Sequence, residues 1–204
     1  MSQKMNMSMK TLKMIQLALL IAIIALMAFT PIGFIRTPGL EITLIGIPVV
    51  VGAVLLGPAG GAILGAAFGL CSFLQCFGLS PFGAALLAIN PFWTFVVCLV
   101  PRTLMGWLSA LIFKGLQKVD KTRFFSFLAA CLGGALLNTI LFMTALMLCF
   151  GQTEYILGMQ GAMNVFAFVI AFVGVNGLIE GIVCAVAGTA VSKALYVVLY
   201  RDRD

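Results

Sequence analysis

The amino-acid sequence predicts an all-α integral membrane protein, a bundle of six transmembrane helices with cytoplasmic N- and C-termini. Of the 204 residues, 63% are hydrophobic and only 9% are charged, and the mean hydropathy is +1.20. Because an average soluble domain carries about 25% charged residues, a water-soluble globule is excluded. A spanning helix needs roughly 20 apolar residues. Six spans and their loops therefore account for residues 1–204 as a single membrane domain.

The first two spans are expected at residues 12–30 and 42–56. The first is an apolar run that follows three lysines and ends at a proline. A secretory signal peptide has a similar pattern, but no Ala-x-Ala cleavage site and no polar domain follow, so we expect a retained helix. The second follows a polar loop at 31–41 and ends at a Gly57-Pro58 turn.

The remaining spans are separated by charged or turn-forming residues, and we expect them at 59–77, 92–116, 124–150 and 162–200. Residues 78–91 are rich in Gly, Ser and Pro and predict the longest weakly hydrophobic loop between spans. A short polar loop is expected at 151–160. The dipeptide Pro101-Arg102 interrupts the fourth span.

The basic residues indicate how the bundle is oriented. Ten of the twelve fall on the side that would hold the N-terminus, namely Lys4, Lys10, Lys13, Lys114, Lys118, Lys121, Arg123, Lys193, Arg201 and Arg203. The positive-inside rule places that side in the cytoplasm. The net charge of +6 is then a topology signal and no indication of nucleic-acid binding, because the basic residues form no continuous stripe. The loops at 31–41 and 78–91 face outward.

Several kinds of chemistry are excluded by what the sequence lacks. It has no histidine, and its six cysteines show no CxxC or metal-ligand spacing, so we expect no metal site and interpret the cysteines as apolar packing residues. No G-x-x-x-x-G-K-[ST] phosphate loop and no acidic cluster for magnesium occur. The chain is therefore not predicted to be an enzyme or to carry a cofactor, and any ATP hydrolysis belongs to another subunit.

Five polar residues lie within or near the ends of the apolar spans. Arg102 costs about 3 kcal/mol at such a depth, and Glu180 lies near the middle of the last span, one turn after Asn176. Asn138 lies deep in the fifth span, and Gln75 near the outer end of the third. One interpretation is a cavity that orients a polar solute. The others are an internal Arg102–Glu180 pair with amides bridging helices, and a proton relay.

Small residues predict two close helix contacts. Gly61, Gly65 and Gly69 form two consecutive GxxxG steps on one face of the third span, and we expect them to pack against another helix of the bundle. Ala18 and Ala22 form an AxxxA step in the first span. Spacing alone favours internal packing for this step over contact with a partner helix.

The order and spacing of these segments resemble a known family. The stretch "ITLIGIPVVVGAVLLGPAGGAILGAAFGLCS" (42–72) looks like the second and third helices of the substrate-binding S components of energy-coupling factor (ECF) vitamin transporters. Together with "CLVPRTLMGWLSALIFKGL" (98–116) and "LLNTILFM" (136–143), it is most similar to pantothenate-specific members. The resemblance covers nearly the whole chain. Residues 78–91 are short for the loop that caps the site in those members.

The resemblance implies a function and a set of partners. S components bind a vitamin with high affinity from outside the cell and associate with a transmembrane coupling (T) subunit and two cytoplasmic ATPases in the plasma membrane of a prokaryote. Ala18 and Ala22 fall where the family docks on the coupling subunit. The alternatives are an S component for riboflavin, folate, hydroxymethylpyrimidine or a queuosine precursor, and a stand-alone ion-coupled secondary carrier.

Pantothenate is an anion with hydroxyl and amide groups, so a buried Arg102 is suited to its carboxylate and the amide side chains to its polar groups. Glu180 would supply a counter-charge to Arg102 when the site is empty. Flavin or thiamine would instead require stacked aromatic rings, and the two tryptophans are not obviously paired. The candidate substrate-binding residues are Arg102, Asn138, Asn176, Glu180, Gln75, Trp93 and Asn90.

Overall fold

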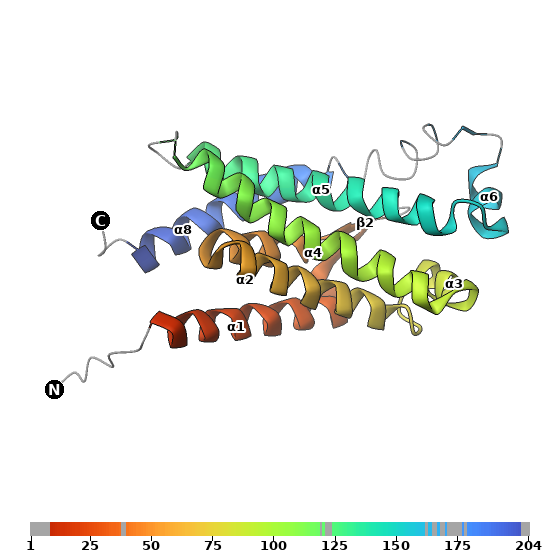
Figure 1. Cartoon of the computed structure of the whole chain (residues 1–204), viewed down its shortest axis with the longest axis horizontal. Helices are drawn as coiled ribbons and strands as arrows, with labels where there is room; N and C mark the ends of the chain where they lie inside the picture. Colours follow the sequence, from red (N-terminus) through yellow and green to blue (C-terminus); the bar gives the residue numbers. More distant parts are fainter. Residues whose placement is uncertain are drawn as a thin grey trace.

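The computed structural model describes residues 9–37, 40–118, 120, 124–161, 163–164, 167, 170, 177 and 179–200. These residues are mainly helical. The elements are α1 (Met9–Phe29), η1 (Pro31–Gly33), β1 (Phe34–Thr37), β2 (Leu40–Thr43), α2 (Gly46–Gln75), α3 (Pro81–Ile89), α4 (Pro91–Leu116), α5 (Phe124–Phe150), α6 (Glu154–Gln160), η2 (Cys184–Gly188) and α8 (Thr189–Tyr200). Figure 1 shows the long helices lying side by side along the long axis of the molecule.

Four helices in the described part of the chain are long and apolar enough to cross a membrane. They are Lys10–Phe29 of α1, Gly46–Gln75, Pro91–Leu116 and Phe124–Phe150. These bounds agree with the spans predicted at 12–30, 92–116 and 124–150, and α2 contains most of the two spans predicted at 42–56 and 59–77. The prediction of an α-helical membrane protein is therefore confirmed.

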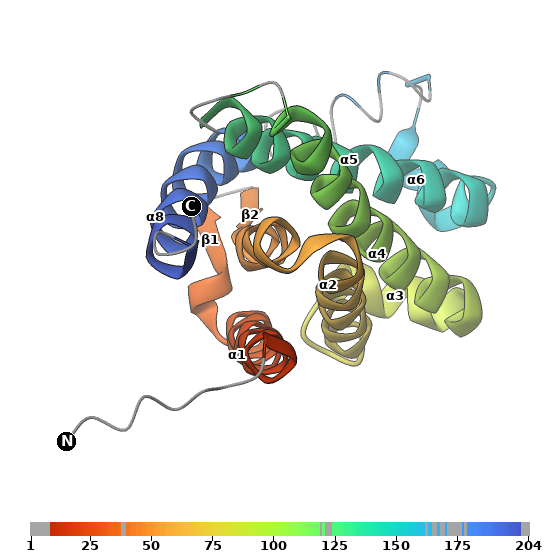
Figure 2. The same ribbon diagram turned by 60° about the vertical axis from the view of Figure 1, so that its left-hand side comes forward.

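Helix α2 is broken where a turn was expected. Gly57 has φ 81° and ψ −172°, a left-handed φ that favours glycine, and Pro58 follows it. The two halves of α2 pack closely on each other. A Cβ built on Gly52 would overlap the Leu64 side chain, and one on Gly61 would meet Ala53. Figure 2 shows the halves as two separate coils joined by a short extended link.

Three segments that were expected to be loops contain regular structure. Residues 31–41 hold most of an antiparallel β-hairpin, in which β1 and β2 pair with Arg36 opposite Glu41. Residues 78–91 hold α3, and residues 151–160 hold α6. The loop predictions at 78–91 and 151–160 were wrong because turn-forming residues also begin short helices, and the loop at 31–41 was wrong because its two extended segments pair with each other.

The short helices begin with standard caps. Ser80 precedes Pro81 and its side-chain oxygen accepts a hydrogen bond from the Gly83 amide at 3.2 Å. A Ser before a Pro at the first helical position is a favourable start for a helix. Thr153 caps α6 in the same way through the Ile156 amide at 3.5 Å.

The three glycines of the repeated GxxxG motif pack α2 against α4. A Cβ on Gly61 would overlap the main-chain oxygen of Gly106, and one on Gly69 would lie against Leu99. The contact is reciprocal, since a Cβ on Gly106 would overlap the oxygen of Gly61. Internal packing of the glycine face is therefore confirmed, and it brings the two backbones into contact.

The interior of the bundle is mainly apolar. The largest cluster includes Ile24 of α1, Val50 and Leu64 of α2, Met105 of α4 and Phe127 of α5. All six cysteines are free thiols, and four of them, Cys76, Cys98, Cys131 and Cys184, are buried. The burial of these four agrees with their interpretation as packing residues.

Both ends of the bundle can be recognised in Figure 1. The start of α1, the end of α4, the start of α5 and the end of α8 lie at one end, and α3 and α6 lie at the other. The end with the helix termini carries the described lysines, which are Lys10, Lys13, Lys114, Lys118 and Lys193. The expected clustering of positive charge at one end is therefore present in the described residues.

Candidate functional site

Arg102 of α4 lies inside the bundle. The proline before it leaves a backbone carbonyl without its helical hydrogen bond, and the arginine side chain donates to that carbonyl. Pro101 has no backbone N–H, so the carbonyl of Val97, four residues earlier, receives no helical hydrogen bond from position 101. The Arg102 guanidinium donates to that same carbonyl through Nη1 at 2.9 Å. Pro101 therefore leaves the Val97 carbonyl without a helical donor, and Arg102 supplies a side-chain donor in its place.

The rest of the guanidinium lies between two aromatic rings. Its central carbon is 4.7 Å from the ring centroid of Phe142 on α5 and 5.5 Å from that of Phe68 on α2. Such contacts stabilise a cation that has lost water. The Nε atom is buried and has no hydrogen-bond partner. Because a guanidinium has five N–H donors in a fixed fork, this arrangement retains donors for an anion.

Asn138 and Glu180 line a common cavity next to this arginine. The cavity lies between the start of α2, α4, α5 and the helical residues at 179–184, and Met105 and Thr43 also contribute to its wall. Its volume is about 10 Å³, which is room for about one water molecule. The Oδ1 atom of Asn138 is buried without a hydrogen-bond partner. A buried, unsatisfied acceptor is costly unless a ligand or water completes it.

Helical spacing connects the cavity to the arginine. Met105 lies one turn after Arg102 on α4, and Phe142 lies one turn after Asn138 on α5. Arg102 and Glu180 interact electrostatically, but the guanidinium bonds to the Val97 carbonyl and forms no direct ion pair with Glu180 in the described residues. An internal Arg102–Glu180 pair is therefore not found.

Three other predicted site residues lie away from this cluster and have structural partners. Gln75 donates through Nε2 to the carbonyl of Ala28 and so joins the end of α2 to the end of α1. Asn90 caps α4, its Oδ1 accepting from the Phe92 and Trp93 amides at 3.1 and 3.2 Å.

Trp93 is half-exposed in the first turn of α4, where its ring meets that of Phe92 edge-on at 5.4 Å. Nine residues separate it from Arg102, which is about 13 Å along a helix. Asn176, the remaining predicted site residue, lies outside the described residues.

Sequence reasoning missed the two rings that enclose Arg102 and the contribution of the hairpin. Phe68 lies directly before Gly69, so the glycine contact between α2 and α4 brings it to the arginine. Thr43 falls within the span expected at 42–56, but it ends β2 and lines the cavity wall that Glu180 also lines. Helical spacing places Phe142 on the same face of α5 as Asn138, but it does not show which helix that face meets.

The AxxxA step of α1 faces away from the bundle. Ala18 and Ala22 are exposed, as are Ile15 and Leu19 beside them. The opposite face of α1, which includes Ile24, is buried against the rest of the bundle. Internal packing, which spacing alone favoured, is therefore not what this step does.

Comparisons with known proteins agree with this architecture. The model of the family "ECF transporter, substrate-specific component" matches residues 12–191. The pantothenic acid transporter PanT of Lactococcus lactis subsp. cremoris (strain MG1363) is 32% identical over 167 residues, which cover 75% of this chain and 76% of PanT. The chain therefore belongs to the family of substrate-specific components of ECF transporters.

Proposed function

We propose that this protein binds pantothenate at the outer face of the plasma membrane and delivers it to an ECF transport module. The vitamin-binding S component is a multi-pass protein of the bacterial plasma membrane, in keeping with its family and its apolar helices. The choice of pantothenate is supported by the likeness to PanT. The observation that carries the site is a guanidinium inside an apolar bundle with a buried Nε that has no partner.

Pantothenate has groups that match the unsatisfied atoms. Its carboxylate would accept hydrogen bonds from the remaining donors of Arg102, whose strength is increased by the low dielectric of the bundle. Its hydroxyl or amide N–H would donate to Oδ1 of Asn138. Glu180 on the same cavity would accept from a second hydroxyl. Because the present cavity holds about one water, binding requires the surrounding elements to separate.

We propose six spans with both termini in the cytoplasm. The lysines at the end of the bundle that holds the start of α1 and the end of α8 support this orientation through the positive-inside rule. The β-hairpin, α3 and α6 then lie toward the outside of the cell. A vitamin would enter the bundle between these elements.

We propose that the exposed face of α1 docks on the transmembrane coupling subunit. Ala18 and Ala22 form a smooth strip there, which lets a partner helix approach closely. ATP hydrolysis would then take place in the two ATPase subunits of the module, and this chain would act without catalysing a reaction.

Equilibrium binding of labelled pantothenate to the purified protein tests the proposal. We expect Arg102→Ala to weaken binding at least 30-fold, because truncating one member of a buried charged pair costs about 2–5 kcal/mol. The control is Lys10→Ala, an exposed lysine in the first turns of α1. Unchanged affinity in Arg102→Ala would contradict the assigned role of the arginine.

A second experiment tests the identity of the vitamin. Mass spectrometry of the small molecule that co-purifies with the protein should detect pantothenate. Detection of riboflavin, folate, hydroxymethylpyrimidine or a queuosine precursor in its place would overturn that choice. Uptake that persists without ATPase subunits and stops when the proton gradient collapses would indicate a secondary carrier.

A further inference from the structure

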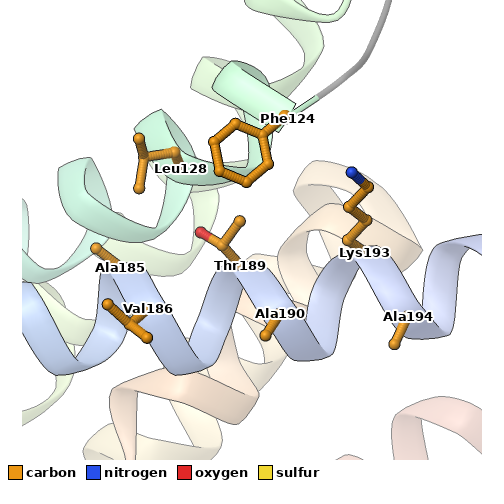
Figure 3. Close-up of a pocket in the computed structure, with 8 residues that line it drawn as sticks. All are labelled: Phe124, Leu128, Ala185, Val186, Thr189, Ala190, Lys193 and Ala194. Carbon is orange, nitrogen blue, oxygen red and sulfur yellow. The ribbon is translucent and has the colours of Figure 1, made fainter.

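The side of the bundle has an open groove between α5 and α8. It is far larger than the cavity beside Glu180. Its volume is about 740 Å³, within the range of small-molecule sites in proteins. Phe124 and Leu128 form one wall, and Val186, Thr189 and Ala190 form the other, as Figure 3 shows. None of its lining residues belongs to α1, so the groove is separate from the exposed AxxxA face.

The apolar character of the groove suits an alkyl chain. Alanines along α8 leave the space that larger side chains would fill, and a π-helical turn at Cys184–Gly188 precedes them. Such turns are frequent at functional sites in helices. The groove lies on the outside of a membrane protein, a surface that lipid acyl chains can reach. Each methylene group that it buries contributes about 0.8 kcal/mol relative to water.

One end of the groove carries a single cation. The ammonium group of Lys193 lies 5.3 Å from the centroid of the Phe124 ring, and the lysine is exposed. Within the described chain no carboxylate pairs with it. The hydroxyl of Thr189, one turn earlier, is buried and points toward α5 in Figure 3. A cation beside an apolar groove complements a ligand with an anionic head and a hydrocarbon tail.

We propose that this groove binds an anionic phospholipid of the cytoplasmic leaflet. Its acyl chain lies between α5 and α8, and its phosphate contacts the ammonium group of Lys193. The position of Lys193 at the basic end of the bundle places it near the headgroups of that leaflet, which are rich in anionic lipids. This inference uses the orientation proposed above but is independent of which vitamin is bound.

Native mass spectrometry of the delipidated protein tests the proposal. Phosphatidylglycerol and phosphatidylcholine with identical acyl chains are added at increasing concentrations. We expect phosphatidylglycerol to bind about fivefold more tightly, the effect of one lysine at an anionic surface. In Lys193→Gln this preference should disappear, whereas the control Lys118→Gln, a lysine of the same end outside the groove, should retain it.

A second variant tests the groove itself. Ala190→Trp fills the space between α5 and α8 and should abolish binding of both lipids. Pantothenate binding should be unchanged in all three variants, which shows that they are folded and separates this test from that of the vitamin site. Retention of the phosphatidylglycerol preference in Lys193→Gln would overturn the proposal. So would an Ala190→Trp variant that binds lipid normally but no longer co-purifies with a coupling subunit, since the groove would then be a protein interface.

Discussion

Gly65 of α2 lies directly against the main-chain carbonyl of Arg102 on α4. A Cβ at position 65 would overlap both the carbonyl carbon and oxygen of the arginine. The GxxxG motif therefore has a consequence beyond packing, because it fixes how deeply the arginine backbone sits in the bundle. The same contact brings Phe68, one turn along α2, to the guanidinium.

Enlarging Gly65 should separate α2 from α4. We expect Gly65→Leu to lower the free energy of unfolding by about 1–3 kcal/mol, the usual cost of overpacking, and to weaken pantothenate binding because Arg102 moves away from Phe68. Thermal unfolding and ligand binding in detergent measure both effects. The control is Gly115→Ala, where a new Cβ meets nothing within 4 Å. Normal stability and affinity in Gly65→Leu would show that the contact does not position the arginine.

Pro101 should influence binding through the carbonyl of Val97. In Pro101→Ala the new backbone N–H donates to that carbonyl, so the α4 helix is stabilised while Arg102 loses its fixed partner. We expect a higher melting temperature together with several-fold weaker pantothenate binding. Pro91→Ala is the matched control, because Pro91 lies in the first turn of α4, where a missing N–H costs nothing. A variant that binds as tightly as the wild type would refute this role for the proline.

The unsatisfied oxygen of Asn138 predicts opposite effects on stability and binding. We expect Asn138→Leu to raise the stability of the ligand-free protein by about 1–3 kcal/mol, because it removes a buried acceptor that has no partner. Pantothenate should then stabilise the variant much less than the wild type. Thermal shift assays with and without the vitamin measure both quantities. The exposed Thr144→Val on the same helix serves as the control. An equal ligand-induced shift in both variants would argue against a contact between Asn138 and the vitamin.

Arg102 illustrates how far the sequence predicts the site. Its depth in an apolar span identifies it as costly, and this much was predicted. Its bond to the Val97 carbonyl was not predicted, although Pro101 leaves that carbonyl without a helical donor. The rings of Phe68 and Phe142 could not be predicted, because they depend on how α2 and α5 are rotated against α4. That rotation is set by contacts such as Gly65 on Arg102, which join residues far apart in the sequence.

The fold, like the site, was predicted in part. The break at Gly57 was predicted because Gly and Pro in succession mark turns, and GxxxG packing was predicted because it depends on residue size. The β-hairpin and α3 were missed because each is short, and Gly, Pro and Ser occur at helix starts as well as in loops.

The exposed face of α1 should be required for transport but not for vitamin binding. Ala18→Trp places a large ring on the smooth strip that Ala18 forms with Ala22, which should prevent close approach of a helix from the coupling subunit. We expect co-purification with that subunit to be lost while pantothenate affinity stays within about twofold. The control is Ile63→Trp, which puts the same ring on an exposed position of α2 and should leave the complex intact. If both variants, or neither, lose the coupling subunit, the strip on α1 is not the specific docking surface, and another exposed face of the bundle must serve.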